Sequence, residues 1–270
     1  MNPGVRTIPF VKASACGNDF LLIDFALAPV DIQGFTRLIC DRHNGAGADG
    51  VEWMLSHPSA DCEIRLINAD GSEAEISGNG TRCVAAYLCA EQGKEKFAIQ
   101  TGAGLKTCLL TSRSGCEYEF EAAIGAADVQ TQTLLNIGGH EIAGTPVSMG
   151  NPHFVIFVRE FAPDWQALAL EVQRSRQFPQ GVNVEFVRIE GRHDISVRFM
   201  ERGAGETQSS GTGSCAAAVA AIASGDCESP VKVNAPGGTQ TVRREGNDIF
   251  LRGPARLVSR GEFFLSDLSG

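Results

Sequence analysis

The sequence predicts an α/β fold of two similar halves, each rich in strands around one small, apolar helix. The main observation is a segment that occurs twice, at residues 68–90 and 201–223. Ser77 aligns with Ser210, which sets the repeat offset at 210 − 77 = 133, and Gly17-Asn18 meets Gly150-Asn151 at the same offset. Separate ungapped matches that share one offset indicate a single folding unit present twice.

The repeated segment has the pattern of a helix start. Residues 77–80 read SGNG, residues 210–213 read SGTG, and an apolar run of mostly small residues follows each. A serine is a preferred N-cap, and glycines let backbone N–H groups approach a ligand closely. A helix N-terminus also carries a partial positive charge. Each half is therefore predicted to hold an anion site at the start of a buried helix.

The elements of the first half follow in order. Strands are expected at 10–12 and 20–24, joined by a functional Gly-Asn turn, and helical spacing covers 31–40. A Gly-rich loop at 42–50 precedes a strand at 51–55, and a strand at 64–68 leads into the repeated segment. Further strands are expected at 97–101, 105–110 and 117–122.

The second half repeats this order. Strand and turn at 139–147 lead to a second Gly-Asn turn, a strand at 154–158 and a helix at 165–176. Strands at 182–187 and 195–201 precede the helix at 211–223. Short strands follow at 231–233, 240–243, 249–251 and 262–265. The predicted domains are residues 1–120, joined by a C-terminal strand at about 262–270, and residues 121–261.

Composition restricts the partners. The chain has 270 residues, 23 Lys and Arg against 32 Asp and Glu, a net charge of −9 and a pI near 5.1. No basic stripe is present, which argues against nucleic acid and against an anionic membrane surface. Nine irregularly spaced cysteines and the lack of a signal-peptide pattern favour a reducing, cytoplasmic location.

Two such helix ends, one from each half, would converge on a shared cleft if the halves pack with pseudo-twofold symmetry. Mirrored groups on either side of one carbon suit two-base chemistry, in which one side removes a proton and the other returns it. Such a site needs no cofactor, and the histidines show no metal-ligand spacing. Taken singly, each serine is better explained as a structural N-cap. Only the duplication favours a site.

Several motifs resemble the diaminopimelate epimerase family, in order and over nearly the whole chain. They are GNDF at 17–20, RHNGAGADG at 42–50, NADGSEAE at 68–75, GNGTRC at 78–83, GNPH at 150–153, GVNVEF at 181–186 and ERGAGET at 201–207. The resemblance implies a pyridoxal-independent isomerase that interconverts LL- and meso-diaminopimelate for lysine and peptidoglycan synthesis. It also implies two pseudo-symmetric domains, each a mixed β-sheet wrapped around a central helix, and a homodimer.

The resemblance assigns roles to single residues. The substrate is expected to be a small dicarboxylic amino acid. Its α-carboxylate is expected on the amides of Gly78, Asn79, Gly211 and Thr212. The substrate-binding asparagines would be Asn18, Asn68, Asn151 and Asn183. Glu201 with Arg202 matches the distal binding pair, and His153 with Glu201 matches residues beside the catalytic thiols. Gly50 stands where the family can carry a binding side chain.

The chain departs from the family at both catalytic positions, where Ser77 and Ser210 replace cysteines. A thiol is a few per cent ionised at neutral pH, from a pKa of about 8.5, whereas a serine hydroxyl is not. Three interpretations follow: an engineered Cys→Ser pair, a divergent racemase or dehydratase that activates serine through His153 or Glu201, or an amino-acid-binding protein without turnover. Cys83 and Cys215 lie inside their helices and are interpreted as core residues.

Overall fold

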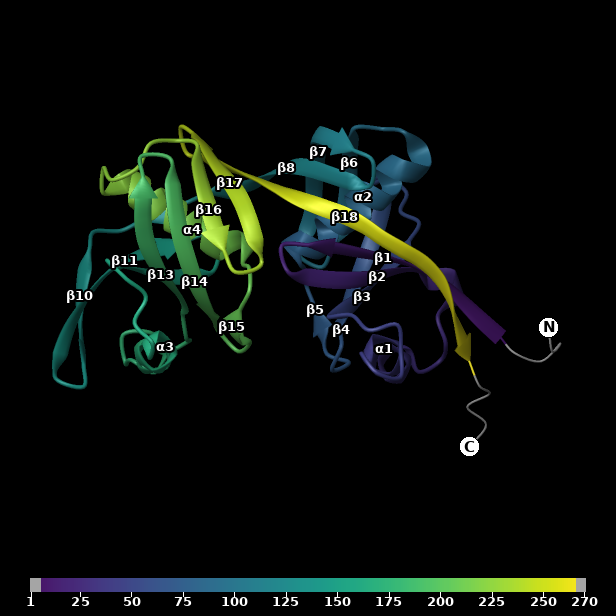
Figure 1. The fold of residues 1–270 in the computed structure, drawn as a ribbon, viewed down its shortest axis with the longest axis horizontal. Coiled ribbons are helices and arrows are strands. Elements are labelled where there is room, and N and C mark those ends of the chain that lie inside the picture. Colours follow the sequence, from purple (N-terminus) through teal and green to yellow (C-terminus); the bar gives the residue numbers. More distant parts are fainter. Residues whose placement is uncertain (1–5, 266–270) are drawn as a thin grey trace. The chain divides into compact units, whose positions relative to one another are not determined.

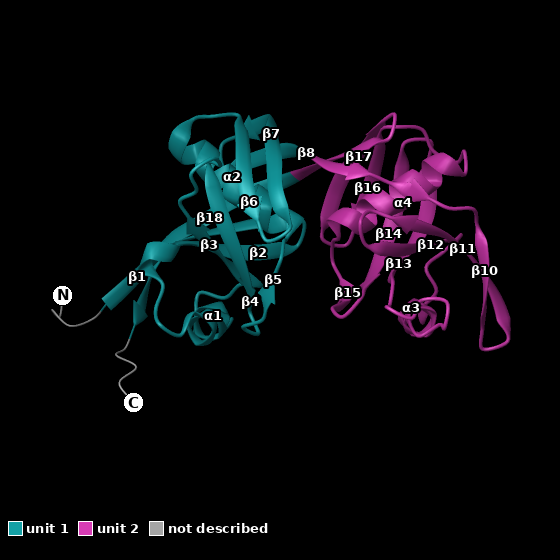
Figure 2. Ribbon diagram, turned by 180° about the vertical axis from the view of Figure 1, so that it is seen from behind, with its two compact units in different colours: residues 1–121, 254–270 teal, residues 122–253 magenta. Residues whose placement is uncertain are grey.

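The computed structural model describes residues 6–265, which belong to two compact units (Figure 2). Unit 1 comprises residues 1–121 and 254–270, and unit 2 comprises residues 122–253. The chain re-enters unit 1 at residue 254. From the sequence, the C-terminal strand that joins the first domain is expected at about residues 262–270. Residues 266–270 of that expected strand lie outside the described part of the chain.

Unit 1 is built on a mixed sheet whose neighbours are mostly antiparallel (Figure 1). Two pairs are parallel, β2 with β3 and β4 with β6. The strands are β1 (Arg6–Ala15), β2 (Asn18–Asp24), β3 (Gly50–Leu55), β4 (Cys62–Asn68), β5 (Glu73–Ala74), β6 (Lys96–Thr101), β7 (Gly104–Ser114) and β8 (Glu117–Ala126).

The central helix of unit 1 is α2 (Gly78–Gln92). Ser77 caps its start, and Gly93 ends it in the left-handed conformation (φ 68°), as glycine does at helix C-termini. Cys83, Val84, Ala85 and Ala86 are fully buried. A short 3₁₀ turn, η1 (Phe25–Leu27), and α1 (Ile32–Cys40) precede this helix in the chain, and α1 packs on β3 and β4.

Unit 2 repeats the architecture. The pairs β12 with β13 and β14 with β16 are parallel, at the places of the two parallel pairs in unit 1. The elements are β9 (Asp128–Val129), β10 (Thr133–Ile137), β11 (His140–Ser148), β12 (Pro152–Phe157), α3 (Trp165–Gln173), β13 (Asn183–Gly191), β14 (Asp194–Glu201), β15 (Gly205–Thr207), α4 (Gly211–Ala223), β16 (Val231–Ala235), β17 (Gly238–Glu245) and β18 (Asp248–Leu265). The predicted fold class, a mixed sheet wrapped around a central helix in each half, is confirmed.

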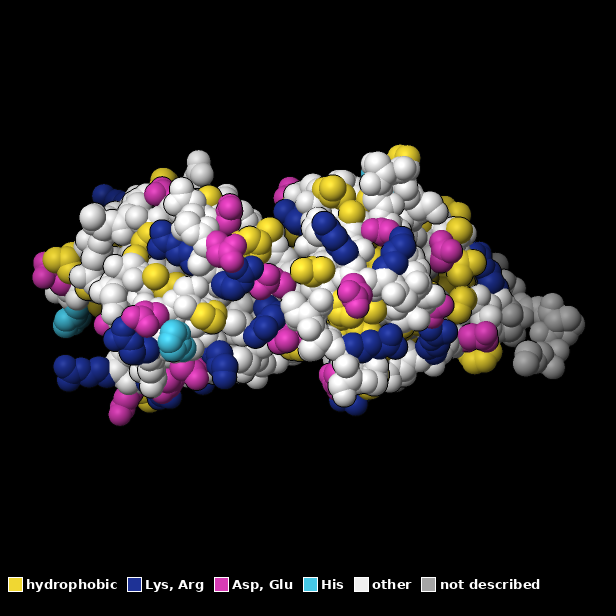
Figure 3. Space-filling model, turned by 90° about the horizontal axis from the view of Figure 1, so that it is seen from above, with side chains coloured by type: hydrophobic (Ala, Val, Ile, Leu, Met, Phe, Trp, Pro, Cys, Tyr) yellow, Lys and Arg dark blue, Asp and Glu magenta, His cyan; other side chains and the backbone are white. Residues whose placement is uncertain are grey.

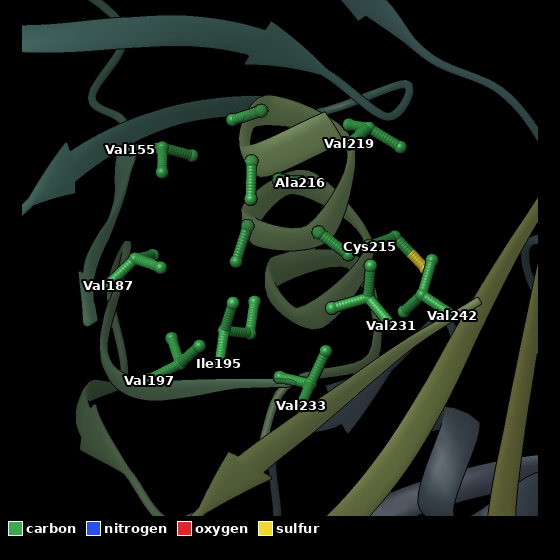
Figure 4. Packing of buried hydrophobic residues seen from close by; sticks show 14 of the residues in the cluster. Val155, Val187, Ile195, Val197, Cys215, Ala216, Val219, Val231, Val233 and Val242 are labelled. Atoms are coloured by element: carbon green, nitrogen blue, oxygen red, sulfur yellow. The ribbon is translucent and has the colours of Figure 1, made fainter. Parts of the chain in front are cut away.

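The core of unit 2 surrounds α4, whose buried face is almost entirely alanine. Valine and isoleucine side chains of the surrounding strands point at this helix, among them Val155, Val187 and Val233 (Figure 4). Ala216 is fully buried within this cluster. Small side chains allow the strands to close around the helix, because a larger residue has no space there.

We expect Ala216→Leu to destabilise unit 2 by about 1–3 kcal/mol, because three added carbon atoms must displace packed valines. Chemical denaturation followed by circular dichroism measures the change. Ala223→Leu is the matched control, because Ala223 is exposed at the end of the same helix. Equal midpoints for the two variants would show that α4 is not tightly enclosed.

One sequence prediction of strands was wrong. The separate strands expected at 249–251 and 262–265 are parts of the single long strand β18 (yellow in Figure 1). Its first part pairs with β17, from Thr241 opposite Arg252 to Glu245 opposite Asp248. Its later part pairs with β1. Two successive partner strands keep the backbone extended through the Gly-Pro pair at 253–254.

The surface carries charges of both signs. On the face that Figure 3 shows, lysine and arginine side chains are interspersed with aspartate and glutamate, with no continuous basic area over the described residues. Among residues 6–265, no helix combines the length and apolarity that a membrane span requires.

Candidate active site

Each central helix begins with the same cap. The Gly80 N–H donates to Ser77 Oγ at 3.1 Å, and the Gly213 N–H donates to Ser210 Oγ at 3.2 Å. The N–H groups of the two residues between each capping serine and its glycine have no hydrogen-bond acceptor in their own helix. They lie at the N-terminal end of the helix, which carries a partial positive charge. The starts of α2 and α4 are therefore each suited to bind a carboxylate.

The Gly-Asn turns bring an asparagine to each helix start. In unit 1, Cys16 (φ 47°) and Gly17 (φ 83°) form the tight turn between β1 and β2, and Asn79 Nδ2 donates to Asn18 Oδ1 at 2.7 Å. In unit 2, Asn151 Nδ2 donates to Thr212 Oγ1 at 3.4 Å. The two contacts are related by the repeat offset. Four predicted residues thus meet in two equivalent pairs.

An ionic network fixes the asparagine of unit 1. Asn18 Nδ2 donates to Asp49 Oδ2 at 3.2 Å, and Arg42 bridges Asp49 and Asp19 at 2.8 and 2.7 Å. Burial opposes the ionisation of Asp19, but hydrogen bonds from Arg42 and Lys12 outweigh it and lower the pKa of Asp19 to about 2. The GNDF turn and the RHNGAGADG loop therefore act together to hold Asn18 in place.

Unit 2 has a buried chain of hydrogen bonds in the corresponding place. His153 Nδ1 lies 2.7 Å from Glu185 Oε1, and His153 Nε2 lies 3.0 Å from Asn151 Oδ1. His153 and Glu185 are almost fully buried. Burial raises the pKa of Glu185, although the neighbouring His153 partly offsets it. His153 thus positions Asn151, and its two ring nitrogens bond to Glu185 and Asn151.

The two serines differ in their partners. Ser210 Oγ donates to Glu201 Oε1 at 2.5 Å, a short charge-assisted hydrogen bond. At the repeat offset, the counterpart of Glu201 is Asn68, whose Nδ2 donates to Ser72 Oγ at 3.0 Å. A carboxylate is thus joined to the hydroxyl of Ser210, and unit 1 carries an amide at the equivalent position.

Asn183 and Arg202 lie on neighbouring strand ends of unit 2. Asn183 Nδ2 donates to the carbonyl of Pro152 at 3.0 Å, and its Oδ1 accepts from the Arg202 N–H at 2.9 Å. The exposed Arg202 side chain also donates from Nη1 to the Gln180 carbonyl at 2.9 Å. A guanidinium group has further N–H donors beyond this one. Arg202 therefore retains donors for an anionic ligand.

Gly50 is the counterpart of Asn183 in unit 1. A Cβ atom at Gly50 would lie 2.8 Å from the Ile67 carbonyl oxygen, so the local backbone excludes a side chain as it stands. Cys83 and Cys215 are fully buried in their helices, and burial raises the pKa of the Cys83 thiol. This agrees with their interpretation as core residues.

Sequence reasoning missed two buried glutamates, Glu52 on β3 and Glu185 on β13. A signal was available, because Val51-Glu52-Trp53 aligns with Val184-Glu185-Phe186 at the repeat offset. A charged residue in the middle of an apolar strand, present in both copies, indicates a buried polar function.

Each unit therefore carries what we call a half-site: a serine-capped helix start with an asparagine beside it. The unit 1 half-site consists of Ser77, Gly78, Asn79 and Asn18, and Asn68 is added to it as the repeat counterpart of Glu201. The unit 2 half-site consists of Ser210, Gly211, Thr212, Asn151, His153, Asn183, Glu201 and Arg202. In residues 6–265, no cluster of three or more His, Cys, Asp or Glu side chains is arranged to hold a metal ion.

Comparison with known proteins identifies sequence relatives over nearly the whole chain. The family model described as "Diaminopimelate epimerase" matches residues 10–121 and 145–258. The diaminopimelate epimerase of Pelotomaculum thermopropionicum is 37% identical, over 94% of this chain and 98% of that protein. The diaminopimelate epimerase of Elusimicrobium minutum is 38% identical over the same shares.

Solved structures share the fold at low sequence identity. A PhzF-family phenazine biosynthesis protein of Bacillus anthracis has a TM-score of 0.71 and 18% identity, covering 96% of this chain and all of the other. A hydroxyproline epimerase of Agrobacterium vitis, solved with bound trans-4-hydroxy-L-proline, has a TM-score of 0.69 and 17% identity, covering 98% and 93%. These structures place the strand and helix arrangement in a known fold.

Proposed function

Because this chain belongs to the diaminopimelate epimerase family, whose members are isomerases, we propose that it binds a dicarboxylic amino acid through its half-site residues and transfers the proton at the Cα of that amino acid. Diaminopimelate is the proposed substrate. The observation that carries this proposal is the 2.5 Å hydrogen bond between Ser210 Oγ and Glu201 Oε1 at the start of α4. A hydroxyl joined to a carboxylate can accept a proton that a free serine cannot.

The first-turn amides of a central helix are proposed to bind the α-carboxylate of the substrate. In unit 1 these are the amides of Gly78 and Asn79, and in unit 2 those of Gly211 and Thr212. Removing the α-proton moves negative charge onto this carboxylate. Amides and helix dipoles that already point at it stabilise that charge without rearrangement. No step of this scheme requires a cofactor.

Glu201 is proposed as the base behind Ser210. As Ser210 Oγ takes the proton from Cα, the hydroxyl proton passes to Glu201 Oε1, so no free alkoxide forms. Arg202, the next residue in the chain, is proposed to bind the distal carboxylate with its remaining donors. His153 takes no proton in this scheme and holds Asn151 in place.

The unit 1 half-site is proposed to be the weaker partner in proton transfer. Ser77 Oγ accepts from Gly80, and Asn68 stands where unit 2 has Glu201. Asn68 can neither take nor supply a proton as Glu201 can, so a proton given by Ser77 to the substrate would leave an alkoxide unless solvent supplied another proton. We therefore expect exchange of the Cα proton on the Ser210 side to be faster than complete epimerisation.

Deuterium exchange at Cα tests the proposal. The protein is incubated in D₂O with LL-diaminopimelate, meso-diaminopimelate and a panel of other amino acids. Mass spectrometry then follows incorporation, and chiral chromatography follows inversion. We expect deuterium to enter one diaminopimelate epimer faster than the epimers interconvert. Binding without exchange for every amino acid would instead identify a non-catalytic binding protein, and exchange confined to another amino acid would identify a divergent racemase or dehydratase.

Replacing the base gives a sharper result. Glu201→Gln keeps the size of the side chain and removes the proton acceptor of Ser210, so we expect exchange to fall about 10²-fold or more. The readout is the initial rate of deuterium incorporation. Glu206→Gln is the control, because Glu206 is exposed, lies in the same unit and contacts Gln166. An unchanged rate in Glu201→Gln would rule out Glu201 as the base.

A further inference from the structure

One buried carboxylate lies beneath the first turn of each central helix. Glu52 on β3 has no exposed surface, and Glu185 on β13 is 1% exposed. The two residues are related by the same repeat offset that relates the serines. Burying a carboxylate in a strand is costly, so a matched pair at this position indicates a shared role.

Each carboxylate contacts the glycine that holds the capping serine. A Cβ atom placed on Gly80 would lie 1.9 Å from Glu52 Oε1, and one placed on Gly213 would lie 2.9 Å from Glu185 Oε1. The same glycines donate their N–H groups to Ser77 and Ser210. The glutamates therefore reach the first turns of the helices, where the proposed carboxylate ligand binds.

The two glutamates differ in their partners. Glu185 Oε1 pairs with His153 at 2.7 Å. Both carboxyl oxygens of Glu52 lack a hydrogen-bond partner within residues 6–265. Phe20 stands at the offset position of His153, so unit 1 has no imidazole there to share the charge. Buried polar groups normally have hydrogen-bond partners, so a buried carboxyl group without one, packed against a helix start, requires an explanation other than fold stability.

The surroundings of Glu52 are almost uncharged. Its register neighbours are Leu22 on β2 and Leu66 on β4, and the titratable groups that its charge affects are the thiols of Cys62 on β4 and Cys83 on α2. Burial raises the pKa of Glu52 to about 8.

One further charge and one helix complete these surroundings. The guanidinium of Arg82 on α2 is bound to Asn79 and to the Pro254 carbonyl. Helix α1 packs on β3, where Trp53 donates to Thr36. Within residues 6–265, no cation is thus paired with Glu52, and its burial favours the neutral carboxyl.

We propose that Glu52 is a positioning residue of the unit 1 half-site, which leaves the amides of Gly78 and Asn79 able to bind a carboxylate while it is neutral and opposes a bound carboxylate when it is ionised. Two negative charges on either side of one helix turn repel strongly in a low-dielectric interior. The inference rests on the proposed function for the location of the substrate carboxylate. It adds that Glu52, a residue that does not touch the substrate, controls how tightly a carboxylate binds at this location.

Calorimetric titration with meso-diaminopimelate between pH 6.5 and 9.5 tests the inference. We expect wild type and Glu52→Gln to bind alike at pH 6.5, and wild type to bind about tenfold more weakly than the variant above pH 8. Comparing proteins at each pH cancels the titration of the ligand itself. Glu52→Leu should follow Glu52→Gln, and Glu95→Gln, which removes an exposed carboxylate of unit 1, should follow wild type. Parallel pH profiles for wild type and Glu52→Gln would overturn the inference.

A second readout separates this inference from the proposed function. If neither protein binds diaminopimelate at any pH, the proposed substrate is wrong. The ¹⁵N amide shifts of Gly78, Asn79 and Gly80 in the ligand-free protein then decide the role of Glu52. They should titrate near pH 8 in wild type and stay constant in Glu52→Gln. Equal shifts in both proteins would overturn the role of Glu52 by themselves.

Discussion

Replacing Ser77 and Ser210 by cysteine together is expected to raise the rate of diaminopimelate epimerisation by roughly 10²–10⁴-fold. A thiol has a pKa of about 8.5, so part of it is thiolate at neutral pH and can remove a Cα proton without a second base. Both serines already lie at helix starts whose first-turn amides can donate hydrogen bonds to a carboxylate. Interconversion of LL- and meso-diaminopimelate, followed by chiral chromatography, measures the gain.

Single variants and a matched pair control this experiment. Ser77→Cys or Ser210→Cys alone should gain less, because the second proton transfer still depends on a serine. Ser59→Cys with Ser224→Cys introduces two thiols at exposed positions, one in each unit, and should gain nothing. A correctly folded double-cysteine protein that does not act on diaminopimelate would contradict the substrate assignment.

Glu52→Gln is expected to stabilise the protein at alkaline pH by up to roughly 3–5 kcal/mol, from the raised pKa and about 1.36 kcal/mol per pKa unit. Burial raises the pKa of Glu52 from an ordinary 4.5 to about 8 in the folded state. At pH values between 4.5 and about 8, Glu52 is protonated in the folded protein and ionised in the unfolded chain. The free energy of unfolding of wild type therefore falls as pH rises from about 4.5 to 8. Glu52→Gln has no titrating group at this position, so its free energy of unfolding does not fall for this reason.

Chemical denaturation at pH 4, 6, 8 and 9 measures the difference. The two proteins should be similar at pH 4, where the carboxyl is protonated in both states, and should diverge up to pH 8. Glu95→Gln, at an exposed position of the same unit, should track wild type throughout. A constant difference between wild type and Glu52→Gln at all four pH values would show that folding does not raise the pKa of Glu52.

The central helices could be predicted from the sequence because their signals are local. Ser210 before Gly211, a glycine three residues into each motif, and an unbroken run of small apolar residues define α4 from Gly211 to Ala223, the range expected. The same local signals at residues 77–90 predicted α2, the first copy of the repeat. The pairing of Asn18 with Asn79 and of Asn151 with Thr212 is also implied once the Gly-Asn turns are placed beside the helices.

Other features depend on contacts between distant segments and leave no local pattern. The continuity of β18 follows from its pairing with β17 and β1, which a Gly-Pro pair at 253–254 obscures. The hydrogen bond between Ser210 and Glu201 requires the end of β14 to lie beside the start of α4. The burial of Glu52 follows from the enclosure of α2, since the same residue at a strand edge would be exposed.

A crystal structure with diaminopimelate bound tests the central claim most directly, because the claim concerns which atoms hold the substrate carboxylate. We predict that the α-carboxylate of the bound ligand makes hydrogen bonds with the amides of Gly211 and Thr212, and that its Cα lies beside Ser210 Oγ. A ligand bound away from the start of α4 would contradict the claim.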